Sequence, residues 1–264
     1  MTRVSVDGGE LGYTVGGTGS PVVLVHGGSL DRGTWDDQAA AFESRHTVVR
    51  YDLRGHGASS EPTEPFAHYA DLAVLLDHLD LPRVSLVGHS LGARVVVDFA
   101  LSNPDRVDRL VLAAPGISGM TFRNPVLLRR IEELIAVRAA GDIERAVELL
   151  LRIWVDGPHR TPEQVAPAVR ARCAAMITDA VTGHTRAAQT MMRELSAIDR
   201  VGEVHAATLV VTGDRDWSDI HGVVSLLARE LPDVAVLDVA GAGHLVGLER
   251  PESFTEAVLG HLDR

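Results

Sequence analysis

The sequence contains no lysine, because all 25 of its basic residues are arginine. This absence excludes Schiff-base lysines, Ser-Lys dyads and phosphate-binding loops that need a lysine. Cysteine is nearly absent as well, since Cys173 is the only one in 264 residues. An intramolecular disulfide and a thiolate metal site are therefore excluded, and we expect a reducing, cytoplasmic setting.

Long apolar runs and basic clusters are also missing. No run approaches the ~18 to 20 apolar residues that a membrane span needs. The stretch from Thr2 to Asp7 mixes polar and apolar residues, unlike a secretory signal. The formal net charge is −11, with 36 acidic residues against 25 basic ones. A surface of this sign repels phosphate backbones and anionic lipids, so we expect no nucleic-acid partner and no membrane partner.

Short apolar runs alternate with amphipathic stretches along most of the chain. The strands expected from these runs cover residues 4–6, 11–15, 21–25, 47–51, 84–87, 107–113, 208–212 and 234–239. The expected helices cover residues 34–42, 68–80, 91–102, 220–230 and 251–262. This alternation predicts an α/β fold, in which a mostly parallel twisted sheet is flanked by helices on both faces.

The strand pattern disappears between residues 120 and 198. One helical face there carries Ile143, Val147, Leu150 and Trp154. Thr161 is expected to cap a helix that restarts at Pro167. A helical insertion in an α/β sheet is typical of a lid, so we predict a core over 1–119 and 199–264 and an all-helical lid over 120–198. A purely structural helical layer is the alternative.

The segment Gly88-His89-Ser90-Leu91-Gly92 joins a strand directly to a helix. So sharp a turn forces its corner residue into strained backbone geometry, which costs about 1 to 3 kcal/mol. Glycines two residues to either side allow the close approach that the turn requires. The corner presents the Ser90 hydroxyl beside the Leu91 N–H, a free donor at a helix N-terminus. We therefore predict Ser90 as a nucleophile and Leu91 as one donor of an oxyanion hole.

This motif and four other segments resemble the α/β-hydrolase superfamily in its serine-nucleophile branch, and the resemblance extends over nearly the whole chain. The segments are Gly88–Gly92, His26–Gly28, Asp52–Ser59, Gly213–Asp216 and Gly243-His244. The resemblance implies the chain order Ser90, Asp216 and His244 for nucleophile, acid and base. It also implies that the backbone N–H of Gly28 is the second oxyanion donor, with Ser29 as the neighbouring alternative.

Several residues compete for the roles of acid and base. Asp214 and Asp219 flank the predicted acid; we expect Asp214 to brace its turn and Asp219 to cap the following helix. Among the 12 histidines, His26 and His56 lie beside glycines in turns, where an imidazole supports the backbone. His89 is expected to face away from the nucleophile.

The walls of the substrate pocket are less well defined by the sequence. We expect them to include Ser29, Asp31, Trp35, Trp154 and Met191, with a place in the core as the alternative for Trp35. Arg54 is expected to be structural and Cys173 to be a small buried side chain. A likeness to enol-lactone hydrolases would imply a substrate carboxylate, and the lid arginines that could meet it are Arg123, Arg129, Arg130 and Arg152. The alternative is that these arginines belong to a solvated helix face.

A serine at the corner argues against haloalkane dehalogenase and epoxide hydrolase chemistry, which uses an aspartate there. The nearest likeness is to enol-lactone hydrolases and esterases, which implies hydrolysis of a small carboxylic ester or lactone through a Ser90 acyl-enzyme. The alternatives are a carbon–carbon bond hydrolase, a cofactor-free haloperoxidase or perhydrolase, and a non-hydrolytic ligand receptor or biosynthetic cyclase. We expect no cofactor, no metal ion and only a small-molecule partner; the oligomeric state stays open.

Overall fold

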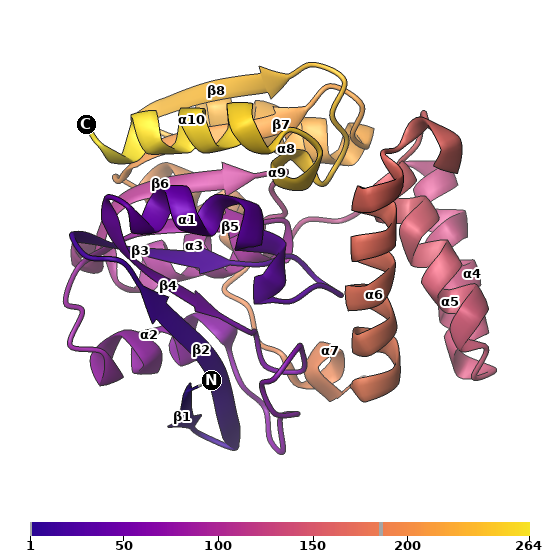
Figure 1. Cartoon of the computed structure of the whole chain (residues 1–264), viewed down its shortest axis with the longest axis horizontal. Coiled ribbons are helices and arrows are strands. Elements are labelled where there is room, and N and C mark those ends of the chain that lie inside the picture. Colours follow the sequence, from indigo (N-terminus) through magenta and orange to yellow (C-terminus); the bar gives the residue numbers. More distant parts are fainter. Residues whose placement is uncertain (1, 185–186) are drawn as a thin grey trace.

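A computed structural model describes residues 2–184 and 187–264 of the chain. Its centre is an eight-stranded sheet in the order β1-β2-β4-β3-β5-β6-β7-β8 (Figure 1). The strands are β1 (Thr2–Val6), β2 (Gly9–Gly16), β3 (Ser20–Val25), β4 (His46–Tyr51), β5 (Val84–His89), β6 (Val107–Ala113), β7 (Ala207–Gly213) and β8 (Val234–Val239). The β1–β2 hairpin pairs antiparallel with β4, and every pairing from β4 to β8 is parallel. The α/β prediction is confirmed.

Helices cover both faces of this sheet (Figure 1). One face packs against α2 (His68–His78), α3 (Leu91–Ser102) and α8 (Ser218–Glu230), and the other packs against α1 (Asp36–Glu43), α9 (Val246–Glu249) and α10 (Pro251–Leu262). The apolar spacing explains this packing: Leu72, Leu75 and Leu76 of α2 lie on one helical face and are fully buried. The central strands of the sheet are thus covered on both faces.

A helical segment between β6 and β7 covers the end of the sheet at which the parallel strands finish (Figure 1). It contains α4 (Pro125–Ala139), α5 (Ile143–Leu150), the π-helical turn η3 (Leu151–Asp156), the 3₁₀ turn η4 (Pro162–Gln164), α6 (Pro167–Gly183) and α7 (Ala187–Met191). Within the described part of this segment there is no strand, only an isolated bridge between Phe66 and Met192. Thr161 is the N-cap of η4 and α6 begins at Pro167, as the sequence predicts.

The predicted helical face from Ile143 to Trp154 holds only in part, because Val147, Leu150 and Trp154 pack in one apolar cluster and Ile143 does not. The α-helix ends at Leu150 and widens into the π-helical turn, so Trp154 does not continue the face of α5. The Ile143 side chain is exposed, while Ala146 and Leu149 are buried in its place. A π turn is a local adjustment that leaves no mark in apolar spacing, and such turns are frequent at functional sites.

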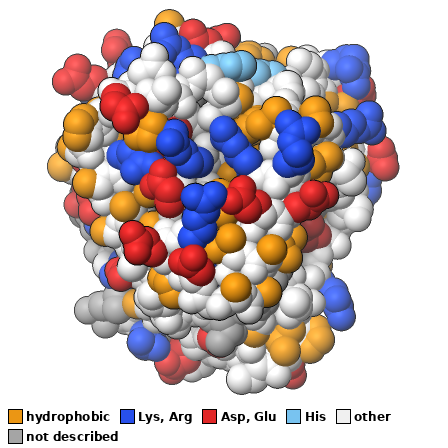
Figure 2. All heavy atoms as spheres, turned by 90° about the vertical axis from the view of Figure 1, so that its right-hand side faces the viewer, with side chains coloured by type: hydrophobic (Ala, Val, Ile, Leu, Met, Phe, Trp, Pro, Cys, Tyr) orange, Lys and Arg blue, Asp and Glu red, His pale blue; other side chains and the backbone are white. Residues whose placement is uncertain are grey.

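The outer face of the helical segment carries charges of both signs. Figure 2 shows basic and acidic side chains interleaved with apolar ones over this face. Arg145 pairs with Glu133, and Glu148 accepts hydrogen bonds from Arg152 and Arg170. No described helix is both long enough and apolar enough to span a bilayer.

The turn from β5 to α3 leaves no room for side chains at its two flanking glycines. A Cβ on Gly92 would overlap the Val25 carbonyl oxygen, and one on Gly88 would lie 2.5 Å from the Gly92 carbonyl oxygen. Both obstacles are backbone atoms of the central sheet and its helix, so they cannot move aside as a flexible side chain would.

We expect Gly92→Ala to lower the free energy of unfolding by about 1 to 3 kcal/mol or more, because the added methyl overpacks against backbone. The matched control is Gly222→Ala in the interior of α8, where nothing lies within 4 Å of an added Cβ. That change should instead raise stability by about 0.5 to 1 kcal/mol. Urea unfolding of both variants checks the signs, and a stabilised Gly92→Ala protein would contradict this packing.

Candidate active site

Ser90 lies at the corner between β5 and α3 in a backbone conformation that side chains rarely adopt, with φ of 53° and ψ of −107°. Its N–H donates to the Ala113 carbonyl at 3.0 Å, and its carbonyl accepts from Gly116 N–H at 3.2 Å. Strain of this kind costs about 1 to 3 kcal/mol and persists only where the surroundings impose it. These two contacts and the two flanking glycines impose it here.

Asp216 and His244 come from loops that follow β7 and β8, at the same edge of the sheet as Ser90. The Nδ1 of His244 lies 2.8 Å from Asp216 Oδ2, and its Nε2 lies 2.9 Å from Ser90 Oγ. Asp216 is held in turn by the Trp217 N–H, which donates to its Oδ1 at 2.7 Å. With Nδ1–H donating to the carboxylate, Nε2 is free to accept the serine proton.

The loop that carries His244 is held from both sides. Below it, His89 Nε2–H donates to the His244 carbonyl oxygen at 2.9 Å. Above it, Glu249 accepts from Gly243 N–H at 3.1 Å and forms a buried ion pair with Arg160 from the helical segment. A Cβ on Gly243 would overlap the Arg160 guanidinium, so the glycine makes room for this ion pair.

His89 corrects one sequence expectation. Rather than facing away, it lines the same cavity as Ser90, and its ring lies 5.2 Å from that of His244. Burial lowers the pKa of His89 to about 3, so the imidazole is neutral at physiological pH. The sequence around Ser90 could not predict this hydrogen bond, because the carbonyl oxygen that His89 binds belongs to a loop 155 residues further along the chain.

Gly28 and Leu91 line the same cavity as Ser90, and their backbone N–H groups are the predicted oxyanion donors. Neither donates to an acceptor within the described ranges of the chain. The Gly28 loop is supported by His26, whose Nδ1–H donates to the Gly27 carbonyl at 2.8 Å and whose Nε2 accepts from Leu53 N–H at 2.9 Å. Burial lowers the pKa of His26, which keeps this imidazole neutral in its supporting position.

The catalytic cavity has a volume of about 210 Å³ and a mostly apolar wall. Trp154 from the π turn lies over His244, with its indole 4.8 Å from the imidazole ring, and Phe122 lies 6.0 Å from the same indole. Ser29 and Trp154 line the cavity as expected. Phe122, Met120 and Ile220 also line it, and the sequence pattern did not indicate them.

Three of the expected pocket residues lie elsewhere. Asp31 accepts a hydrogen bond from Gly33 N–H at 2.7 Å and caps a short 3₁₀ turn, η1 (Arg32–Trp35). Trp35 is buried and stacks on Phe254 on the α1–α10 side of the sheet. Met191 is in α7, where its carbonyl oxygen accepts from Phe66 N–H at 3.2 Å. These positions depend on packing between distant segments.

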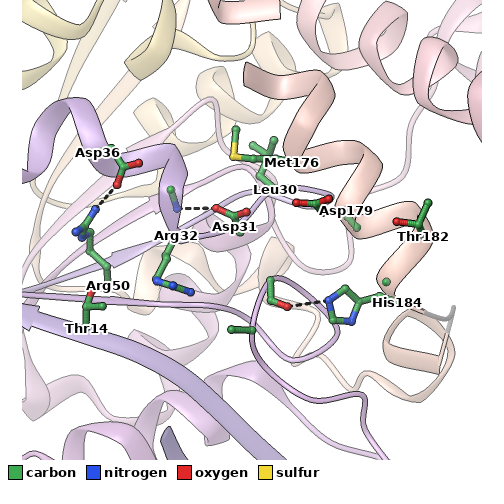
Figure 3. A pocket seen from close by; sticks show the side chains of 15 residues that line it. Thr14, Leu30, Asp31, Arg32, Asp36, Arg50, Met176, Asp179, Thr182 and His184 are labelled. Atoms are coloured by element: carbon green, nitrogen blue, oxygen red, sulfur yellow. Dashed lines mark hydrogen bonds and ion pairs between the residues drawn. The ribbon is translucent and has the colours of Figure 1, made fainter. Parts of the chain in front are cut away.

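A second, larger cavity of about 710 Å³ opens beside the first, between α6 and the loop before η1 (Figure 3). Leu30 lines both cavities, so the two are neighbours. In Figure 3, Asp31 and Asp179 face the hollow from opposite walls, while Arg50 pairs with Asp36. His184 contacts the Gly57 carbonyl oxygen at 3.1 Å at its lower edge.

The carboxylates that flank Asp216 have structural partners. Asp214 accepts from Gly241 N–H at 2.7 Å and braces its turn, as expected. Asp219 does not cap α8, because it lies inside the first turn of that helix. It accepts instead from Arg123 N–H, and from Asn124 N–H at 3.1 Å, which fixes the start of α4.

Arg54 and Cys173 lie outside the catalytic cavity. Arg54 is buried in an ion pair with Asp71, and its guanidinium lies 4.5 Å from the ring centre of Phe66. Cys173 is buried in α6, where burial raises the pKa of its thiol to about 12. A thiol so resistant to ionisation is a packing residue.

Comparison with known proteins assigns the chain to a family. Residues 20–251 match the α/β hydrolase fold, and the chain belongs to that family.

Two individual relatives match nearly the whole chain, and a third matches less than half of it. A thermophilic esterase from Thermogutta terrifontis is 28% identical, covers 100% of this chain and 98% of its own, and has a TM-score of 0.83. The 3-oxoadipate enol-lactonase 2 of Acinetobacter baylyi is 25% identical over 94% of this chain and 91% of its own. An uncharacterized protein of Mycobacterium bovis is 39% identical over 115 residues, or 42% of this chain and 34% of its own. The match thus spans about a third of that relative's length.

We expect the protein to lose stability in mild acid, in part through His89. In the unfolded chain a histidine has a pKa of about 6.5, whereas burial holds that of folded His89 at about 3. Between these values the unfolded state binds a proton that the folded state does not, so stability falls as the pH drops. At pH 5 the loss from this one group is about 2 kcal/mol.

Urea unfolding at pH 7.5 and pH 5 measures this dependence. His89→Gln should remove about 2 kcal/mol of the difference between the two pH values. The control is His159→Gln, which removes an exposed imidazole. An unchanged pH dependence in His89→Gln would show that His89 is not buried as a neutral imidazole.

Proposed function

We propose that the protein is a serine hydrolase that cleaves small carboxylic esters or lactones through a Ser90 acyl-enzyme. The observation that carries the proposal is the chain of hydrogen bonds from Ser90 Oγ through His244 to Asp216, at 2.9 and 2.8 Å. A serine hydroxyl is a weak nucleophile until a base accepts its proton, and His244 Nε2 is in position to do so.

In the first half of the reaction, Ser90 Oγ attacks the substrate carbonyl while its proton passes to His244 Nε2. The negative charge that develops on the carbonyl oxygen is stabilised by the N–H groups of Gly28 and Leu91, each worth about 3 to 4 kcal/mol. When the tetrahedral intermediate collapses, the bond from carbon to the leaving oxygen breaks. His244 gives its proton to that oxygen, which leaves as an alcohol or, from a lactone, stays attached as a hydroxyl group.

In the second half, a water molecule takes the place of the leaving group. His244 accepts a proton from this water as its oxygen attacks the acyl carbon, and the same N–H groups hold the oxyanion. Collapse releases the carboxylic acid and returns the proton to Ser90. Asp216 keeps Nδ1 protonated throughout and stabilises the imidazolium that forms twice in each cycle.

We further propose that residues 120–198 act as a lid over a core of residues 1–119 and 199–264. Trp154 supports this role, because it reaches from the helical segment to within 4.8 Å of the catalytic imidazole. An indole over that ring excludes water from the imidazole. The Arg160–Glu249 ion pair ties the same segment to the His244 loop.

The substrate class follows from the size of the cavity and from the relatives. About 210 Å³ of space, with a mostly apolar wall, suits a small acyl compound rather than a polymer. The esterase of Thermogutta terrifontis and the enol-lactonase of Acinetobacter baylyi support ester and lactone bonds as the targets.

A panel of methyl esters, aryl esters and lactones, with a β-diketone to detect carbon–carbon cleavage, tests the proposal. Wild type should hydrolyse at least one ester or lactone, and Ser90→Ala should lower kcat by about a thousandfold or more. Ser225→Ala, which removes an exposed hydroxyl on α8, is the control and should retain full activity. Ester turnover that persists in Ser90→Ala, or cleavage of the diketone alone, would overturn the assignment.

A further inference from the structure

The catalytic cavity contains one arginine. Apart from His89 and His244, Arg94 is the only side chain with a basic or acidic group among the residues that line it; the remainder are apolar residues, glycines and two serines. A guanidinium in an apolar wall is costly unless it has a partner, because it is always charged and carries five N–H donors. Its position in this wall therefore requires an explanation.

The backbone places Arg94 close to the nucleophile. It is one helical turn after Ser90, and its N–H donates to the Ser90 carbonyl oxygen at 3.3 Å. Gly116 makes the side chain fit: a Cβ there would lie 3.1 Å from Arg94 Nε and 3.3 Å from the Ser90 carbonyl oxygen. A side chain at residue 116 would therefore crowd both the Arg94 guanidinium and the backbone of the nucleophilic corner.

Only part of the guanidinium has a protein partner. Arg94 Nη1 lies 3.1 Å from Glu194 Oε1, and the two side chains are 22% and 24% exposed. No hydrogen bond from Arg94 Nε or Nη2 is formed within residues 2–184 and 187–264. The ion pair uses only one of the two terminal nitrogens, so a second carboxylate can bind the other N–H donors of the guanidinium.

The four arginines of the helical segment, by contrast, either donate hydrogen bonds to other groups or are exposed to solvent. Arg123 and Arg129 are exposed. Arg130 donates to the Arg152 and Gly157 carbonyls, and Arg152 donates to Glu148. None of these four lines the catalytic cavity, which agrees with the alternative that they belong to a solvated helix face.

We propose that Arg94 binds a carboxylate of the substrate, so that the preferred substrates are small esters or lactones that carry a second, free carboxylate group. This inference rests on the proposed hydrolase function and names its substrate class. The geometry suits it, because a planar guanidinium with free N–H groups binds a carboxylate in a defined orientation. The net charge of −11 repels anions in general, which makes a local positive group necessary for such a substrate.

Matched series of methyl esters test the inference. One series carries a terminal carboxylate (monomethyl succinate, glutarate and adipate), and the other ends in a methyl group (methyl butanoate, pentanoate and hexanoate). In wild type at least one acid ester should be hydrolysed with a higher kcat/KM than its neutral partner. Arg94→Met should lower kcat/KM for that acid ester by at least about tenfold and change the neutral series by less than about threefold.

Glu194→Gln tests the same geometry in the opposite direction. It removes the competing carboxylate and keeps the side-chain shape, so kcat/KM for the acid esters should rise severalfold while the neutral series stays constant. Arg129→Met is the control for loss of one positive charge, since Arg129 is exposed on α4, and it should leave the ratio of the two series unchanged. A parallel fall of both series in Arg94→Met would overturn the proposal and show that Arg94 is structural.

A binding measurement separates this proposal from the hydrolase assignment. Calorimetric titration of Ser90→Ala with monomethyl glutarate should give a dissociation constant at least about tenfold lower than in the Ser90→Ala/Arg94→Met double variant. If that difference is present but wild type hydrolyses nothing, the hydrolase proposal fails and the Arg94 site stands. If wild type hydrolyses neutral esters and the two dissociation constants are equal, the Arg94 site fails and the hydrolase proposal stands.

Discussion

The structure depends on the strained backbone corner at Ser90. The sheet imposes the φ of 53° through the Ala113 carbonyl on one side and the Gly116 N–H on the other. The absence of side chains at Gly88 and Gly92 lets β5 and α3 meet without an intervening loop. Because the corner is held by backbone atoms of the central strands, the serine hydroxyl has a fixed position. Every other part of the candidate site is arranged around that position.

The base that faces this serine is held by contacts from three parts of the chain. His89, next to the nucleophile, donates to the His244 carbonyl, and Glu249, from the following helix, accepts from Gly243 N–H. Arg160 joins Glu249 to the helical segment, whose Trp154 covers the imidazole. A displacement of that segment therefore acts on the base directly, through an ion pair and an indole. The proposed lid is thus in direct contact with the residue proposed as the base.

The sequence was most informative where structure is local. The bounds of α3, β6, β8 and α10 were predicted to the residue, because apolar spacing and flanking prolines mark them. The Ser90 corner, Asp216 and His244 could also be found, since motif and chain order define them. The cavity wall could not, because it is assembled from segments that are distant in sequence. Trp35 and Asp31 follow the Gly28 loop directly and yet turn into the core and a 3₁₀ turn. Nothing in the sequence marks Arg94, because its place in the cavity wall depends on Gly116, which follows a different strand.

The central claim is that one serine, Ser90, is activated by its surroundings. A fluorophosphonate forms a covalent bond with an activated serine, so intact-mass analysis followed by peptide mapping tests the claim directly. We expect a single adduct per chain on the peptide that contains Ser90, and loss of that adduct in His244→Ala with the fold retained. No mass gain in wild type, or an adduct on a different serine, would contradict it.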